Sequence, residues 1–121
     1  MITLKRQKGN LGEDIAAAYL KKQGYKILAR NYATKDGEID IVATLGKTLV
    51  FVEVKARATN AYGGGAAAVS RVKQQKITKT ALAYIKENNL KFDALMFDII
   101  TLTDGRAEHI KNAFAVEGYI L

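Results

Sequence analysis

Three short runs in the first half of the chain carry the apolar pattern of β-strands. YKILARNY (25–32) alternates apolar and polar residues, GEIDIVAT (37–44) follows it, and TLVFVEVKA (48–56) is a nearly continuous apolar run. Alternation is typical of a half-buried strand, and a continuous β-branched and aromatic run is typical of a strand covered on both faces. LGK between the last two runs is a turn signal. The pattern predicts three consecutive strands, the last two forming a hairpin.

A first helix is predicted before these strands, over about residues 11–23. Asn10 is a candidate N-cap and Gly24 a C-terminal stop. The apolar positions at helical spacing are Leu11, Ile15, Ala18 and Tyr19.

A second helix is predicted after the glycine-rich segment ATNAYGGGAAA (58–68). Ser70 is a plausible cap, and the helix should run to about Asn88. Its apolar stripe consists of Val72, Ile77, Ala81, Tyr84 and Ile85.

The rest of the chain adds strands. ALMFDIITLT (94–103) is predicted as a fourth strand, and the tail should add a short edge strand around 108–110 and pack Phe114 onto the core. The predicted order is αβββαβ with a further strand at the end. We therefore predict an α/β fold in which helices flank a central mixed sheet, as one domain over residues 1–121.

Composition narrows the function classes. The chain of 121 residues has no cysteine, which excludes disulfides, thiolate nucleophiles and Cys-based zinc sites. It has one histidine, which excludes a His-rich metal centre and argues against a Ser/His/Asp hydrolase. No signal peptide and no apolar run long enough to span a bilayer is present, so a cytoplasmic protein without membrane contact is expected. The net charge of +7 favours a polyanionic partner such as nucleic acid.

Charged residues at the end of the third strand suggest chemistry. Glu53 and Lys55 are two residues apart and therefore point to one face. A hairpin loop with an even number of residues places Asp40 on that face, opposite or diagonal to Glu53. A carboxylate in an apolar environment requires a compensating cation or hydrogen bonds.

One divalent cation can contact both carboxylates, because cross-strand neighbours have Cβ atoms about 5 Å apart. Oxygen ligands favour Mg²⁺ or Mn²⁺ over zinc. Such an ion can polarise a phosphodiester, and Lys55 can position or activate water and stabilise developing negative charge. If Asp40 and Glu53 lay on opposite faces, this site hypothesis would fail.

These residues resemble a known signature. GEIDIV, followed thirteen residues after Asp40 by EVK, resembles the D…(D/E)xK signature of the restriction-endonuclease-like nucleases. The segments GNLGEDIAAAYL, RNYATKDGEIDIVA, LVFVEVKARA and IKNAF resemble the small bacterial YraN-type family, whose members are similar to archaeal Holliday-junction resolvases. The resemblance covers about residues 8–115 and implies the restriction-endonuclease-like core.

The resemblance also implies roles for single residues. Asp40 and Glu53 would be metal ligands and Lys55 the catalytic lysine. Glu13 matches a first-helix glutamate that resolvase-like members add to the site, and Gln74 matches a polar residue of the second helix. The chain departs from the superfamily pattern in having no proline before the first acid, since Ile39 precedes Asp40.

Nucleic-acid contacts are predicted around the same region, with DNA favoured over RNA. Arg57 and Arg71 are expected to contact phosphates, Lys73 lies on the basic second helix, and Tyr62 in the glycine-rich segment could stack on an unpaired base.

Structural roles compete with these functional ones. Asp40 alone could be a solvent-facing acid, and Glu53 with Lys55 a surface ion pair. Glu38 is expected to be a rim residue or ion-pair partner and not a ligand, and His109 a structural or exposed residue of the edge strand. Asp98 could support the site or be a hydrogen-bonded structural residue.

The combined pattern predicts a nuclease that hydrolyses DNA phosphodiesters with Mg²⁺ or Mn²⁺, with branched or junction DNA as a candidate substrate. Cutting two symmetric strands of a junction would require a homodimer. Two alternatives stay open: a nucleic-acid-binding module that keeps the fold without cleaving, and an exonuclease acting on ends.

Overall fold

The structure is a computed structural model that describes the backbone of residues 4–57 and 69–115 and the side chains of residues 11–56 and 69–115. The described part of the chain forms two helices and five strands. They are α1 (Leu4–Lys22), β1 (Lys26–Thr34), β2 (Gly37–Leu45), β3 (Thr48–Arg57), α2 (Arg71–Asn88), β4 (Ala94–Thr103) and β5 (Arg106–Phe114). The predicted order of elements is confirmed, and the further strand at the end is present.

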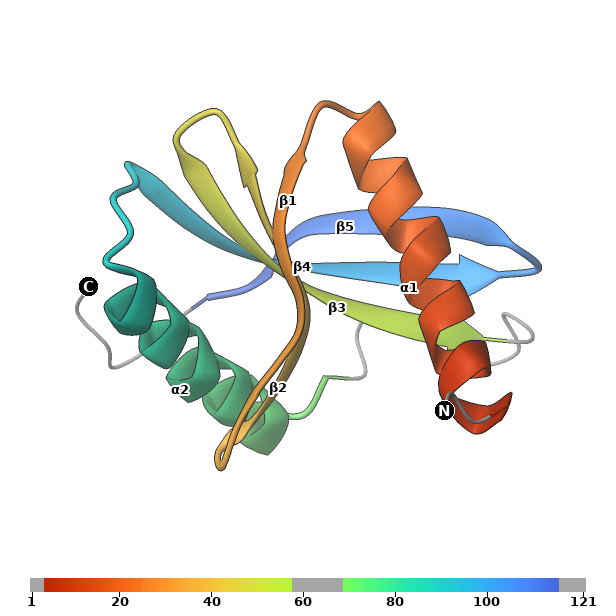
Figure 1. The fold of residues 1–121 in the computed structure, drawn as a ribbon, viewed down its shortest axis with the longest axis horizontal. Helices are drawn as coiled ribbons and strands as arrows, with labels where there is room; N and C mark the ends of the chain where they lie inside the picture. Colours follow the sequence, from red (N-terminus) through yellow and green to blue (C-terminus); the bar gives the residue numbers. More distant parts are fainter. Residues whose placement is uncertain (1–3, 58–68, 116–121) are drawn as a thin grey trace.

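The strands form one mixed sheet in the order β1-β2-β3-β4-β5 (Figure 1). Only the pair β3 and β4 is parallel, because α2 crosses over between them, and the other neighbours are antiparallel hairpins. The α/β class with a central mixed sheet is confirmed and is consistent with a restriction-endonuclease-like core.

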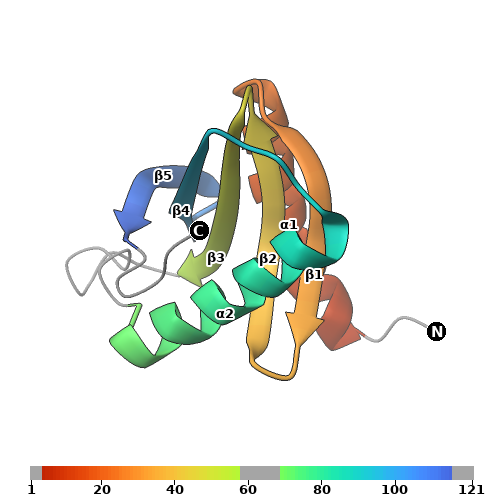
Figure 2. The same cartoon turned by 90° about the vertical axis from the view of Figure 1, so that its left-hand side faces the viewer.

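The two helices cover opposite faces of the sheet, with α2 in front of the strands and α1 behind them in Figure 2. Alternate residues of β3 face each helix, so this central strand is covered on both sides as its apolar run predicts. The α1 face contains Ala16, Ala17, Leu20, Ile41, Ala43, Val50, Val52, Ile100 and Leu102. The α2 face contains Ile39, Val42, Leu49, Phe51, Ile77, Ala81, Tyr84, Phe97 and Ile99.

Helix α1 begins earlier than predicted, at Leu4, so Asn10 lies inside the helix and is not its N-cap. Gly9, Asn10 and Gly12 are poor helix formers. Each lowers the stability of the helix by only about 1 kcal/mol or less, which does not break it. The predicted apolar stripe was wrong at two positions, because Leu11 and Ala18 are exposed. The predicted stop is confirmed: Gly24 has φ of +95°, and the N–H of Tyr25 donates to the carbonyl of Leu20 in a Schellman closure.

Helix α2 has the predicted bounds. The backbone N–H of Lys73 donates to the hydroxyl of Ser70 at 3.1 Å, which confirms Ser70 as the N-cap. Asn89 ends the helix with φ of 49°. Val72 was wrongly assigned to the buried stripe, because this residue of the first turn is exposed.

The hairpin of β2 and β3 has a two-residue loop, Gly46 and Lys47, between the paired residues Leu45 and Thr48. An even loop was the condition for placing Asp40 beside Glu53, and it is met.

Strand β5 is longer than the short edge strand predicted around 108–110. Phe114 stacks on Phe97 with ring centroids 5.0 Å apart, as expected for a residue packed onto the core. Within the ranges described above, no helix is both long and apolar enough to cross a membrane.

Candidate metal centre

Asp40 lies where the regular pairing of β2 with β3 ends. The last regular pair is Ile41 with Val52, and the same register continued by one residue places Asp40 opposite Glu53. The Asp40 carboxylate accepts a hydrogen bond from the backbone N–H of Val54 at 2.8 Å. Asp40 is therefore half-buried against the strand that carries Glu53, and it is not the solvent-facing acid of the structural alternative.

An irregularity in β2 accompanies this position. Ile39 packs on the α2 face together with Val42, whereas strict alternation would separate residues three apart. Ile41 packs on the α1 face. We infer that β2 twists around Asp40, which turns its carboxylate toward the backbone of β3.

The surroundings of Asp40 disfavour its charged form. The pKa of Asp40 is raised to about 7, mainly by burial and next by the negative charge of Glu53, while Glu13 and Glu38 raise it less. The N–H of Val54 opposes these effects but does not cancel them. Asp40 therefore loses its proton only near neutral pH, and a divalent cation bound to its carboxylate would displace that proton.

Three carboxylates converge here from two elements. One oxygen each of Glu13 on α1, and of Glu38 and Asp40 on β2, lie within 4.8 Å of one another, so this group could hold a metal ion. Glu38 was predicted to be a rim residue and not a ligand, but its position in this group makes it a candidate ligand. The available signal was its spacing of two residues from Asp40 on the same strand.

Glu13 contributes a carboxylate oxygen with an unusual environment. Its Oε1 atom is buried and has no hydrogen-bond partner in the described part of the chain. Arg30 forms ion pairs here: its Nη2 atom lies 3.7 Å from this oxygen and 2.7 Å from Oδ1 of Asp14. Burial raises the pKa of Glu13, while hydrogen bonding from Asn31 and the charge of Arg30 lower it. Glu13 precedes the buried residues Ala16, Ala17 and Leu20 on α1 at helical spacing, which brings it toward the sheet.

Glu53 is engaged by a lysine from α2. The Lys73 Nζ atom lies 2.8 Å from Glu53 Oε1, with 48% of the lysine side chain and 11% of the glutamate side chain exposed. The hydrogen bond to Glu53 raises the pKa of Lys73, burial lowers it, and the charges of Glu53 and Asp40 raise it. Lys73 was predicted only as a nucleic-acid contact, and no pattern in the sequence indicates its ion pair with a residue on β3.

Lys55 follows Glu53 by two residues on β3, lies opposite Thr101 of β4, and is half-buried. Strand alternation places it on the face of Glu53, as predicted. Gln74 donates from its amide to the carbonyl of Val69 at 3.0 Å, so it braces the start of α2.

The remaining predicted contacts are only partly described. Arg71 is exposed at the first residue of α2. The backbone of Arg57 ends β3 opposite Thr103, but its side chain lies outside the described residues, as does the whole of Tyr62.

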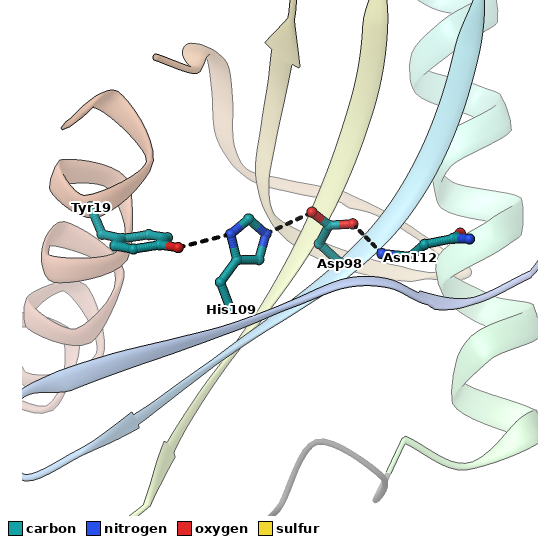
Figure 3. A network of polar contacts seen from close by, with 4 residues as sticks. All are labelled: Tyr19, Asp98, His109 and Asn112. Carbon is teal, nitrogen blue, oxygen red and sulfur yellow. Dashed lines mark hydrogen bonds and ion pairs between the residues drawn. The ribbon is translucent and has the colours of Figure 1, made fainter. Parts of the chain in front are cut away.

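A second polar cluster connects α1, β4 and β5 (Figure 3). The Asp98 carboxylate contacts the Nε2 atom of His109 at 2.7 Å and accepts a hydrogen bond from the backbone N–H of Asn112 at 2.8 Å. The other ring nitrogen of His109 is 3.1 Å from the hydroxyl of Tyr19. The side chains of Asp98 and His109 are 1% and 3% exposed, so both have the structural role that the sequence left open.

The comparisons with known proteins cover the region that carries the carboxylates. Residues 12–102 match the model described as "Uncharacterised protein family UPF0102". A UPF0102 protein of Sulfurihydrogenibium sp. is 46% identical over 113 residues, which are 93% of this chain and 98% of that protein. The chain belongs to the UPF0102 family. A UPF0102 protein of Geobacter sulfurreducens is 48% identical over 111 residues, and one of Trichlorobacter lovleyi is 49% identical over 112 residues; each alignment covers 88% of this chain and 87% or 88% of the relative.

Membership of UPF0102 confirms the resemblance to the YraN-type family. The matched region contains Glu13, Glu38, Asp40, Glu53 and Lys73 and ends before His109. The names of these three UPF0102 relatives state no activity.

Proposed function

We propose that this protein is a metal-dependent nuclease that hydrolyses phosphodiester bonds in DNA, with branched or junction DNA as its preferred substrate. The observation that carries the proposal is the convergence of Glu13, Glu38 and Asp40 oxygens within 4.8 Å, next to Glu53 and Lys55 on the neighbouring strand. The residues that resemble the D…(D/E)xK signature therefore lie beside a compact group of carboxylate oxygens that could bind a metal ion.

The residues fit a hard divalent cation. All the candidate ligands are carboxylates, which favour Mg²⁺ or Mn²⁺ over softer metals. The buried Oε1 atom of Glu13 lacks a hydrogen-bond partner among the described residues, and a cation would supply the missing interaction. Asp40 would hold the ion together with Glu13 and with Glu38 or Glu53.

A bound Mg²⁺ or Mn²⁺ would supply Lewis-acid polarisation of the phosphodiester and lower the pKa of a water molecule. Lys55 lies on the face of Glu53 and can hold that water and stabilise negative charge that develops on the phosphate. The Val54 N–H keeps Asp40 oriented toward β3. Basic residues on the exposed surface of α2 would contact the DNA backbone: Arg71, Lys73 and Lys76.

The test is cleavage of labelled four-way-junction, flap, single-stranded and linear duplex DNA with Mg²⁺ or Mn²⁺. Wild type should cut, and Glu53→Ala should not. Glu108→Ala removes the same charge from an exposed position on β5 and should cut like wild type. Lys55→Ala should lose cleavage and keep DNA binding.

Cleavage by wild type and Glu53→Ala at equal rates would remove Glu53 from the mechanism. Salt-sensitive DNA binding without a metal-dependent product from any variant would overturn the nuclease and leave a binding module that keeps the fold.

A further inference from the structure

The ion pair of Lys73 with Glu53 joins the first turn of α2 to β3, where Glu53 is a candidate metal ligand. The cap fixes the backbone of Lys73, because its N–H donates to Ser70 Oγ at 3.1 Å. Its side chain extends from this fixed point to Glu53 Oε1 at 2.8 Å and is still 48% exposed. The ammonium thus lies between a largely buried carboxylate and solvent.

Negative charge is concentrated around this contact. Three acids, Glu53, Glu13 and Glu38, act on Asp40. A carboxylate as buried as that of Glu53 requires a positive partner. In the metal-free protein Lys73 supplies that partner for Glu53, as Arg30 does for Glu13 and Asp14. In both ion pairs, a basic side chain neutralises carboxylate charge that a divalent cation could also neutralise.

A divalent cation and the ammonium of Lys73 cannot both bind the same oxygen of Glu53 without strong repulsion. A carboxylate-bound Mg²⁺ lies about 2.1 Å from its ligand oxygen, which would leave it only a few ångströms from the Lys73 Nζ atom. The lysine would have to leave Glu53, and its exposed stem gives it a path into solvent.

We propose that Lys73 is an exchangeable counter-ion, which holds Glu53 in the metal-free protein and moves to a phosphate oxygen of the DNA when a divalent cation takes the carboxylates. The inference rests on the proposed function and adds a residue to it. Metal binding would then free a phosphate-binding cation at the site, so that metal and DNA would each bind more tightly in the presence of the other.

The experiment compares wild type with Lys73→Met, Lys73→Arg and Lys79→Met. Lys79 is an exposed lysine of the same helix, so Lys79→Met is the matched control for loss of one charge. Mn²⁺ affinity is measured by titration calorimetry. DNA affinity is measured by fluorescence anisotropy with and without Mn²⁺, with Lys55→Ala added to every protein so that the DNA stays intact.

Lys73→Met should bind Mn²⁺ about five- to tenfold more tightly, because Glu53 loses its competing cation. The same substitution should reduce the gain in DNA affinity that Mn²⁺ produces. Lys73→Arg should resemble wild type, and Lys79→Met should leave Mn²⁺ affinity within twofold of wild type. A purely structural lysine would not shift the two affinities in opposite directions.

If wild type binds Mn²⁺ and Lys73→Met binds it equally or more weakly, the exchange is wrong and the proposed nuclease stands. If wild type binds no Mn²⁺ at all, the proposed function fails, and the exchange fails with it. Circular dichroism of each variant verifies folding, and Lys73→Gln provides a second neutral side chain should Lys73→Met misfold.

Discussion

Asp98 in β4 and Asp40 in β2 both lie within the sheet, yet the two carboxylates have opposite surroundings. Asp98 is almost fully buried, and each of its oxygens has a partner, the ring of His109 for one and the N–H of Asn112 for the other. Asp40 accepts one hydrogen bond from Val54 and is otherwise influenced by other acids.

Asp98 thus shows the surroundings of a structural buried acid, and Asp40 shows those of a functional one. A satisfied network makes the fold more specific, whereas a group of carboxylates without enough positive partners lowers stability unless a ligand compensates it. In the Asp40 group, the raised pKa of Asp40 and the Glu13 oxygen that lacks a hydrogen bond among the described residues both indicate too little positive charge. We therefore expect the two aspartates to respond oppositely to mutation.

The largest effect is expected for Asp98→Ala. Removal of the carboxylate leaves the N–H of Asn112 and the ring of His109 without their partner in a buried position, which should lower the free energy of unfolding by about 3 kcal/mol. Urea denaturation measures the change. Asp98→Asn keeps an acceptor for Asn112 and should cost clearly less. Mn²⁺ should restore neither variant; a loss below about 0.5 kcal/mol for Asp98→Ala would mean that the network is dispensable.

Asp40→Asn should instead stabilise the metal-free protein at pH 8, by about 2 kcal/mol. Folding raises the pKa of Asp40 from its ordinary 3.8 to about 7, so the folded protein retains a proton that the unfolded chain releases. Below about pH 4, Asp40 is protonated in both states and does not lower the free energy of unfolding. As the pH rises through 7, ionisation of Asp40 progressively lowers that free energy. The difference between variant and wild type should therefore grow from pH 4 to pH 8.

Wild type and Asp40→Asn should also differ in their response to Mn²⁺. Saturating Mn²⁺ should raise the thermal stability of wild type, because a ligand that binds only the folded state stabilises that state. It should have little effect on Asp40→Asn, which lacks the proposed carboxylate ligand. Destabilisation by Asp40→Asn at pH 8 without metal would contradict the view that the Asp40 carboxylate is uncompensated.

The smallest effect is expected for Tyr19→Phe, which removes the hydroxyl that contacts His109 and keeps the ring. A loss of about 1 kcal/mol in urea denaturation is expected, since one hydrogen bond is removed at the edge of the network. Cleavage and Mn²⁺ affinity should be unchanged. A large change in either would show that the two clusters are coupled through α1, which carries both Tyr19 and Glu13.

Local rules explain what the sequence could predict. The two-residue period of strands and an even hairpin loop were sufficient to place Asp40 opposite Glu53. The cap at Ser70 and the stop at Gly24 depend on residues within one turn, and both were predicted. The apolar run of β3 correctly indicated a strand covered on both faces.

Tertiary packing explains what the sequence could not predict. The approach of Glu38 to Glu13 depends on how α1 crosses the sheet, and the pairing of Lys73 with Glu53 depends on where α2 packs. The contact of Asp98 with Asn112 requires an irregularity in the pairing of β4 with β5 between Phe97 and Ile99. Such distances are set by the whole fold, and no local spacing in the sequence encodes them.

The most direct test of the central claim is a crystal structure with Mn²⁺, located by its anomalous scattering. We expect a peak coordinated by Asp40 and at least one of Glu13, Glu38 and Glu53, with the Lys73 ammonium displaced if Glu53 is a ligand. Saturating Mn²⁺ without a peak at Asp40, and with Lys73 still bound to Glu53, would contradict it.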